Sequence, residues 1–287
     1  MNQTREIRQI LKSKPTIEGA GVHLKRVFGF SETPSLDPFL LLDDFGSDDP
    51  QRYLQGFPWH PHRGIETITY IVHGEVEHGD SMGNQGTIGP GDVQWMTAGS
   101  GIIHQEMPQG DQDGVLWGFQ LWANLPASHK MMNPRYQEIK SDQIPELVTN
   151  DGVRIRVICG SVGDTTGPVS DIVIDPEYLD ITVPEGSDYH HKTKPGHTVF
   201  AYVIEGNGNF GPDQDRPVEK ETLVIFEDGD HLKVSAGERG LRFLLISGKP
   251  IGEPVAWYGP IVMNTQQELQ LAFQEYRNGT FIKETAS

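Results

Sequence analysis

Short runs of β-branched and aromatic residues recur along this chain, and glycine or proline separates them. Residues 67–72 read Thr-Ile-Thr-Tyr-Ile-Val, a composition that is typical of a strand. The 33 glycines and 20 prolines punctuate such runs throughout the sequence. Glycine and proline supply tight turns between strands. The pattern therefore favours an all-β sandwich or barrel over alternating strand and helix units.

The last part of the chain carries a different periodicity, which predicts one short helix. Thr265 is a suitable N-cap residue, and Glu268 follows three residues later, as in a capping box. Apolar residues then follow at helical spacing before Gly279: Leu269, Ala272, Phe273 and Tyr276. We expect this amphipathic helix to pack on a barrel, with its apolar stripe in the core.

The two halves of the sequence resemble each other. Residues 70–74 (Tyr-Ile-Val-His-Gly) recur 132 positions later as residues 202–206 (Tyr-Val-Ile-Glu-Gly). A Gly-Asp pair at residues 91–92 recurs 138 positions later at residues 229–230. Two similar β units in tandem are the simplest explanation. We therefore expect an N-terminal barrel over residues 1–135 and a C-terminal barrel, ending in the helix, over residues 136–287.

Composition excludes several classes of protein. The chain has 40 acidic and 23 basic residues, a formal net charge of -17, and no Lys/Arg cluster. Direct binding to nucleic acid or to an anionic membrane surface is therefore not expected. There is no apolar run of membrane-spanning length and no apolar leader in residues 1–14. The single cysteine, Cys159, permits no internal disulfide and is interpreted as a buried apolar residue, so a cytoplasmic protein is expected.

Two pairs of metal-binding side chains each stand two residues apart: His60 with His62, and His104 with Glu106. In a strand, side chains at positions i and i+2 point to the same side, so each pair can direct both ligands to one point inside a barrel. Three imidazoles and one carboxylate suit a divalent transition metal and leave positions open for water, oxygen or substrate. These four residues are therefore predicted to form a reactive mononuclear centre.

The repeat allows the same site to be sought in the second half of the chain. At the two offsets, His60 and His62 correspond to Lys192 and Lys194, while His104 and Glu106 correspond to Arg242 and Leu244. Ammonium and guanidinium groups stay protonated, and leucine has no lone pair. We expect metal in the N-terminal half only, with a catalytically silent second barrel that helps to close the pocket. Three further histidines are interpreted as surface or cleft-lining residues: His190, His191 and His197.

Several motifs together resemble the pirin family of the cupin superfamily. They are Leu42-Asp43-Asp44-Phe45 and residues 56–67, 91–99, 104–108, 121–125 and 259–265. The resemblance spans nearly the whole chain. It implies a bicupin, with two stacked antiparallel β-barrels of the jelly-roll type. It also implies one divalent metal in the N-terminal barrel only, with Fe2+ preferred, although manganese, nickel, copper and zinc suit the same ligands.

The fourth ligand has two candidates in the sequence. General cupins often use a glutamate four residues after the second histidine, which is Glu66 here. The resemblance to pirins implies instead the glutamate two residues after the third histidine, which is Glu106. We favour Glu106 as the ligand and interpret Glu66 as a supporting or structural residue.

The resemblance implies an enzyme similar to the flavonol 2,4-dioxygenases, which open the heterocycle of quercetin with O2 and release carbon monoxide. Glu106 would then also be the general base. An aromatic-sized pocket has five candidate lining residues, which fit a plain barrel core equally well: Phe45, Phe57, Trp59, Trp95 and Met96. A second hypothesis is a non-catalytic, iron-binding, redox-sensitive regulator that binds a protein partner, either as a transcription cofactor or on a metabolic enzyme. A third is a metal-dependent isomerase.

Overall fold

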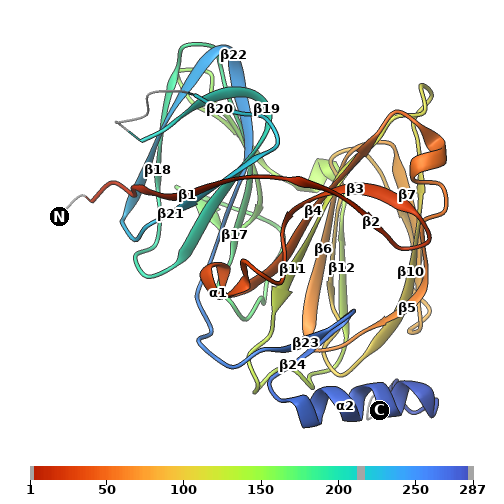
Figure 1. Ribbon diagram of the computed structural model, residues 1–287. Coiled ribbons are helices and arrows are strands. Elements are labelled where there is room, and N and C mark those ends of the chain that lie inside the picture. The colour runs from red at the N-terminus through yellow and green to blue at the C-terminus, as the bar shows by residue number, and fades with distance from the viewer. Residues whose placement is uncertain (1–2, 212–216, 284–287) are drawn as a thin grey trace. The chain divides into compact units, whose positions relative to one another are not determined.

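The computed structural model describes residues 3–211 and 217–283 (Figure 1). Antiparallel strands dominate, which confirms the all-β prediction. The described residues form two compact units. The unit that we call the N-terminal barrel consists of residues 15–33, 39–141 and 251–283. The unit that we call the C-terminal barrel consists of the described residues in 3–14, 34–38 and 142–250.

The N-terminal barrel is built from two antiparallel sheets, the larger of which has the strand order β12-β9-β6-β11-β4-β3-β2. Its strands are β2 (Lys14–Glu18), β3 (Val22–Phe28), β4 (Phe39–Ser47), β6 (Ile65–His73), β9 (Val93–Thr97), β11 (Leu116–Asn124) and β12 (Arg135–Ile139). A single 3-10 turn, η1 (Pro50–Arg52), follows β4. The short helix α1 (Thr33–Leu36) precedes β4 in the chain, but residues 34–36 belong to the C-terminal barrel.

The smaller sheet of this barrel has the order β5-β10-β7-β8. Its strands are β5 (Phe57–His62), β7 (Glu75–Asp80), β8 (Gln85–Ile88) and β10 (Ile102–Gln109). Along β10, residues 102, 104, 106 and 108 are buried, whereas the residues between them are partly exposed. This period of two sends every second side chain into the barrel, where apolar residues of both sheets form the core.

The C-terminal barrel contains the other large sheet, ordered β1-β21-β19-β22-β17-β14-β13, with β18 paired to β22 and β20 to β19. Its strands are β1 (Ile7–Lys12), β13 (Glu146–Val148), β14 (Arg154–Cys159), β17 (Glu177–Val183), β18 (Asp188–Lys192), β19 (Thr198–Phe210), β20 (Val218–Glu219), β21 (Thr222–Phe226) and β22 (His231–Gly248). The turn η2 (Ser141–Gln143) precedes β13. Strands β15 (Ser161–Val162) and β16 (Thr165–Thr166) form a small hairpin. Its core is large and almost wholly aliphatic and aromatic.

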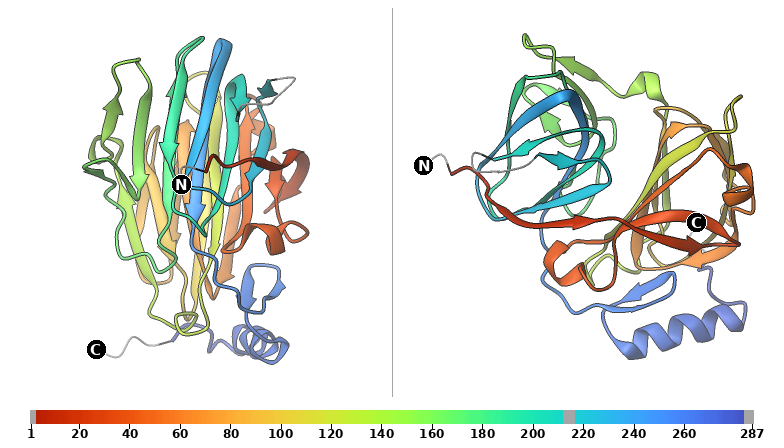
Figure 2. Two further views of the ribbon diagram at one scale, coloured as in Figure 1. Left: turned by 90° about the vertical axis from the view of Figure 1, so that its left-hand side faces the viewer. Right: turned by 45° about the horizontal axis from the view of Figure 1, so that its top comes forward.

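The units do not follow the expected boundaries at residues 135 and 136. Residues 3–14 fold with the C-terminal barrel, and residues 251–283 fold with the N-terminal barrel. Strand β1 pairs with β21 of the C-terminal barrel. Residues 251–283, which we call the C-terminal segment, belong instead to the N-terminal barrel. This segment holds a hairpin of β23 (Ala256–Tyr258) and β24 (Ile261–Met263), followed by α2 (Gln266–Arg277), as Figure 2 shows. The contacts of a segment, rather than its position along the chain, decide which core it joins.

Helix α2 begins as the sequence predicts. Thr265 is the N-cap, and the reciprocal hydrogen bonds with Glu268 complete a capping box. On its apolar face, Leu269 and Ala272 are buried against β23, β24 and Phe281. Of the other two residues in the predicted stripe, Phe273 is partly buried and Tyr276 is exposed, so only part of the stripe is core.

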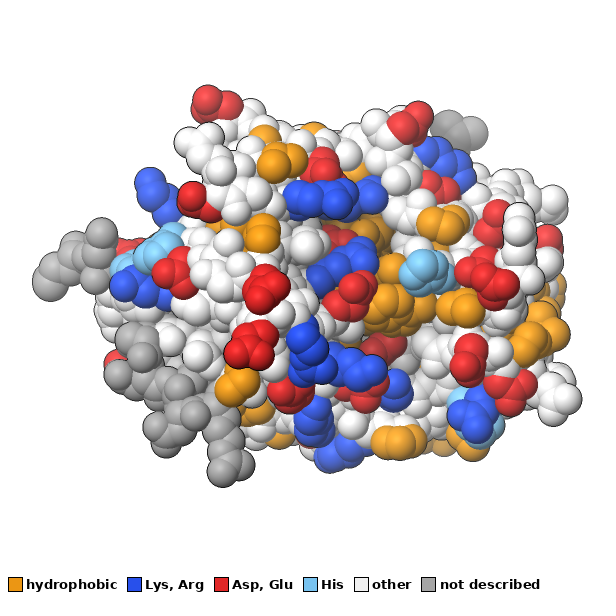
Figure 3. All heavy atoms as spheres, turned by 90° about the horizontal axis from the view of Figure 1, so that it is seen from above, with side chains coloured by type: hydrophobic (Ala, Val, Ile, Leu, Met, Phe, Trp, Pro, Cys, Tyr) orange, Lys and Arg blue, Asp and Glu red, His pale blue; other side chains and the backbone are white. Residues whose placement is uncertain are grey.

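Cys159 is free and buried, and its thiol lies 3.7 Å from the carbonyl oxygen of Val169. On the face in Figure 3, basic side chains lie among acidic ones. Neither helix in the described part of the chain has the length and apolarity needed to span a bilayer.

Candidate metal centre

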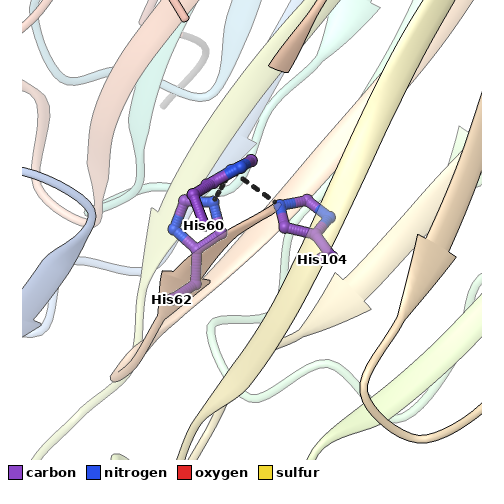
Figure 4. Close-up of side chains that lie close together, drawn as sticks. All are labelled: His60, His62 and His104. Atoms are coloured by element: carbon purple, nitrogen blue, oxygen red, sulfur yellow. Dashed lines mark hydrogen bonds between the residues drawn. The ribbon is translucent and has the colours of Figure 1, made fainter. Parts of the chain in front are cut away.

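Three of the four predicted ligands come together on two neighbouring strands of the smaller sheet. Strands β5 and β10 are antiparallel, and their register places His104 opposite His60 and Ile102 opposite His62. The three imidazole rings point toward one another (Figure 4). Nε2 of His60 lies 2.9 Å from Nε2 of His104 and 3.1 Å from Nε2 of His62. Among the described residues, this is the group of side chains that could hold a metal ion.

Hydrogen bonds on the far side of two rings define which nitrogen faces the centre. His60 Nδ1 lies 2.9 Å from the carbonyl oxygen of Pro58, and His62 Nδ1 lies 3.0 Å from the carbonyl oxygen of Pro260. A carbonyl can only accept, so each Nδ1 must carry the proton. When His60 and His62 are neutral, their Nε2 atoms therefore carry lone pairs that face each other. Two such lone pairs repel unless a cation lies between them.

The two nitrogen spacings that involve His60 fit such a cation. Two imidazole nitrogens that bind one ion at about 2.1 Å and at right angles are about 3.0 Å apart. His62 and His104 are almost fully buried, and burial together with the neighbouring imidazoles holds the pKa of each well below its ordinary value. A neutral imidazole is the form that binds metal. The donor set therefore suits a divalent transition metal.

Glu106 lies on β10 and points into the same barrel, but its carboxylate is not part of the histidine group. One oxygen accepts a hydrogen bond from Thr69 Oγ1 at 3.0 Å, and the other accepts one from Gln120 Nε2 at 2.9 Å. These partners lie on β6 and β11 of the opposite sheet, so the side chain extends across the barrel interior. Sequence spacing placed it on the correct side of the strand, whereas its partners decide where the carboxylate lies.

Glu66 occupies a different environment on β6. It accepts a hydrogen bond of 2.6 Å from Thr97 Oγ1 on β9, within the larger sheet. Burial raises its pKa, which favours the neutral carboxyl group. Glu66 is also absent from the group of side chains that could hold a metal.

A cavity of about 680 Å³ opens beside His60 and His62. Its volume lies within the range of small-molecule sites, roughly 300–1,000 Å³. One wall is a series of aromatic contacts: the ring centroids are 5.0 Å apart for His62 and Trp122, 6.0 Å for Trp122 and Trp257, and 5.6 Å for Trp257 and Phe30. Phe57 and Tyr258 add further apolar surface.

Another part of the lining is charged. The Arg26 guanidinium forms a bidentate pair with Asp43 at 2.9 and 2.8 Å and contacts Glu18 at 3.0 Å. Asp43 is largely buried, and this burial raises its pKa while Arg26 opposes the rise. Gln120, which donates to Glu106, also lines the cavity. The cavity therefore has an aromatic part, a charged part and one lining side chain, Gln120, that contacts the predicted base.

Of the five residues expected to line a pocket, only Phe57 lines this cavity. Trp95 and Met96 are buried in the core, Phe45 belongs to an apolar cluster near Val22, and Trp59 is 52% exposed beside a separate polar recess. Trp122 and Trp257 were missed, although each lies in or near a quoted motif. Only the folded chain brings residues 122 and 257 together.

The repeat-equivalent positions in the C-terminal barrel have other partners. Lys194 pairs with Asp175 at 2.6 Å on the surface, Arg242 pairs with Asp180 at 2.7 Å, and Leu244 is fully buried. The other histidines of this half differ in exposure. His190 is exposed, and His191 is buried between Tyr189 and Glu177.

The two β units and the histidine centre define a two-barrel protein of the cupin type. Comparison with known proteins agrees: the profile described as Pirin matches residues 21–123, and the one described as Pirin C-terminal cupin domain matches residues 178–282. The chain belongs to the pirin family.

Individual relatives cover nearly the whole chain. A pirin-like protein of Caulobacter vibrioides is 43% identical over 278 residues, which cover 96% of this chain and 99% of the relative. A protein of Pseudomonas aeruginosa, provisionally named a quercetin 2,3-dioxygenase, is 40% identical and covers 97% and 99% of the two chains. The crystal structure of quercetin 2,3-dioxygenase from Acinetobacter baumannii is 33% identical, with a TM-score of 0.88 and coverage of 97% and 98%.

Proposed function

We propose that this protein is a metal-dependent dioxygenase that cleaves quercetin-like flavonols with O2, a quercetin 2,4-dioxygenase type of activity. The observation that carries the proposal is the set of converging imidazole nitrogens at the side of an aromatic-walled cavity. The names of relatives in Pseudomonas aeruginosa and Acinetobacter baumannii support the choice of a flavonol and O2.

His60, His62, His104 and Glu106 would hold one divalent transition metal, with Fe2+ preferred. Manganese, nickel, copper and zinc also bind imidazole and carboxylate ligands. When bound, the metal supplies Lewis acidity toward a substrate oxygen and redox access to O2. Burial of His62 and His104 keeps these imidazoles in the neutral form that such a centre requires.

Glu106 would act both as a ligand and as the base that accepts the proton of the flavonol 3-hydroxyl group. Its carboxylate lies in the barrel interior and is held by Thr69 and Gln120. Gln120, which donates to this carboxylate, also lines the cavity. Glu66 is bonded within the larger sheet and has a raised pKa, which supports Glu106 as the fourth ligand.

The aromatic wall would orient the substrate. Planar flavonol rings can stack or make edge contacts with Trp122, Trp257 and Phe30, and such contacts contribute about 0.5–1.5 kcal/mol per pair. The same side chains keep water away from one face of a bound ring. The carboxylates beside Arg26 can accept hydrogen bonds from phenolic hydroxyl groups.

The test combines metal content with gas exchange. We expect the purified protein to bind close to one metal ion per chain, to consume O2 and to release carbon monoxide with members of a flavonol panel. The His60→Ala plus His104→Ala double variant should lose both metal and turnover. Full metal content without O2 uptake would favour the regulator that binds a protein partner, and a product formed without O2 would indicate an isomerase.

A further inference from the structure

One proposed metal ligand is tied to a part of the chain that is almost 200 residues away. His60 uses the nearby Pro58 carbonyl as the acceptor for its Nδ1–H group. His62 uses the carbonyl of Pro260, which lies between β23 and β24 in the C-terminal segment. The two imidazoles therefore present the same nitrogen to the centre, but one depends on a local bond and the other on tertiary structure.

Several contacts hold the Pro260 carbonyl in position. Arg63 directly follows His62 in the sequence, and its carbonyl oxygen accepts a hydrogen bond of 3.1 Å from Val262 N. The buried Lys130 ammonium donates to the carbonyl oxygens of Val262 at 3.0 Å and Gly64 at 2.9 Å. Gly64 has a positive φ of 78°, and a Cβ there would collide with the Val262 carbonyl. The β24 strand can approach this closely only because residue 64 is glycine.

We propose that the β23–β24 hairpin sets the tautomer of His62 and that Pro260 is thus a positioning residue for the metal centre. The inference rests on the ligand set given under the proposed function. A neutral imidazole has one N–H proton, and its position depends on the partner of the other nitrogen. If the Pro260 carbonyl moves away, the form with a proton on Nε2 becomes available, and that nitrogen can no longer donate its lone pair.

The expected size follows from comparable partners of metal-bound histidines. Loss of the group that orients such a ligand typically weakens metal binding by about 10- to 100-fold. The C-terminal segment therefore contributes to the site in two ways: Trp257 and Tyr258 line the cavity, and Pro260 orients a ligand.

Ile261→Asp is the variant that tests this coupling. Ile261 is fully buried and packs with Ala256, Met263 and Leu269. A carboxylate at residue 261 should displace the hairpin beside Pro260. Leu271→Asp is the matched control, because the same change falls on α2 at a side chain that is 53% exposed.

The primary measurement is the tautomer of each histidine in metal-free protein labelled with ¹⁵N-histidine, by long-range ¹H–¹⁵N correlation spectra. In the parent and in Leu271→Asp, we expect the Nδ1–H form for both His60 and His62. In Ile261→Asp, His62 should become a mixture of tautomers, whereas His60 should keep the Nδ1–H form because its partner is local. Zn²⁺ affinity, measured against a chelator, should fall about 10- to 100-fold in Ile261→Asp and stay at the parent value in Leu271→Asp.

Two results would overturn the inference: an Nε2–H tautomer at His62 in the parent, or an unchanged tautomer and Zn²⁺ affinity in a folded Ile261→Asp protein. If that variant does not fold, Gly64→Ala replaces it, because a Cβ at residue 64 would collide with the Val262 carbonyl and displace β24. The expectations and the contradicting results are the same. A parent that binds no Zn²⁺ but keeps the His62 tautomer would refute the ligand set and the coupling to metal. Failure to turn over flavonols would affect only the proposed reaction.

Discussion

Arg63 offers a direct test of how the C-terminal segment is held on the N-terminal barrel. Its side chain is almost fully buried, and its guanidinium donates to the Ser100 carbonyl oxygen at 2.7 Å, to Glu275 Oε2 at 2.7 Å and to the Phe281 carbonyl oxygen at 2.8 Å. The guanidinium carbon also lies 4.2 Å from the centroid of the Phe281 ring. Two of the three acceptors belong to the C-terminal segment.

Arg63→Met keeps much of the apolar stem and removes all these bonds. Breaking a buried ion pair by removing one partner costs about 3–5 kcal/mol. Glu275 remains paired with Lys283 at 2.7 Å and is partly exposed, so it is not left as an isolated buried charge. This favours the lower end of the range, but the Ser100 and Phe281 carbonyls lose a donor, at about 1–3 kcal/mol each. We therefore expect a loss of about 3–5 kcal/mol, since these contributions are not additive.

The assay is urea unfolding of the metal-free protein, so that metal binding does not mask the loss. Hydrogen exchange of α2 is measured in parallel, because the lost bonds anchor this segment. The control is Arg277→Met, which removes the same charge from an exposed position on α2 and should cost less than about 0.5 kcal/mol. A loss below about 1 kcal/mol in Arg63→Met, with unchanged protection of α2, would refute the anchoring role.

Three further predictions concern the fourth ligand, the second barrel and a buried lysine. Glu106→Gln should weaken metal binding or abolish turnover, whereas Glu66→Gln should leave most of the metal in place; metal analysis showing the reverse would assign Glu66 as the ligand. Replacing Lys192 and Lys194 with alanine should leave metal content and flavonol turnover within about twofold, because such surface changes alter stability by less than about 0.5 kcal/mol; lost activity in a folded variant would assign the second half a direct role. Burial lowers the pKa of Lys130 from 10.5 to about 7. Between about pH 7 and 10.5 the unfolded chain therefore binds more protons than the folded protein, and the free energy of unfolding should rise with pH across that interval. Denaturant unfolding of the parent against Lys130→Met checks this, and parallel pH profiles would contradict it.

The β class, the helix cap and the histidine pairs could be read from the sequence because each depends on the spacing of residues close together in the chain. Alternation along β10 sends His104 and Glu106 into the barrel. Thr265 and Glu268 form their capping box within one turn of the chain. The prediction of no metal site in the second half compares side-chain types at fixed offsets, because side-chain chemistry does not depend on the fold.

Tertiary structure decided the remaining features of the site. Trp257, Tyr258 and Pro260 reach the centre only because the C-terminal segment returns to the N-terminal barrel. Glu106 points inward as its spacing predicts, but Thr69 and Gln120 on the opposite sheet determine where its carboxylate lies. Local spacing determines the side of a strand on which a residue lies. Which distant backbone carbonyl or aromatic ring meets it depends on how the sheets and terminal segments bury their apolar surfaces together, which no short stretch of sequence specifies.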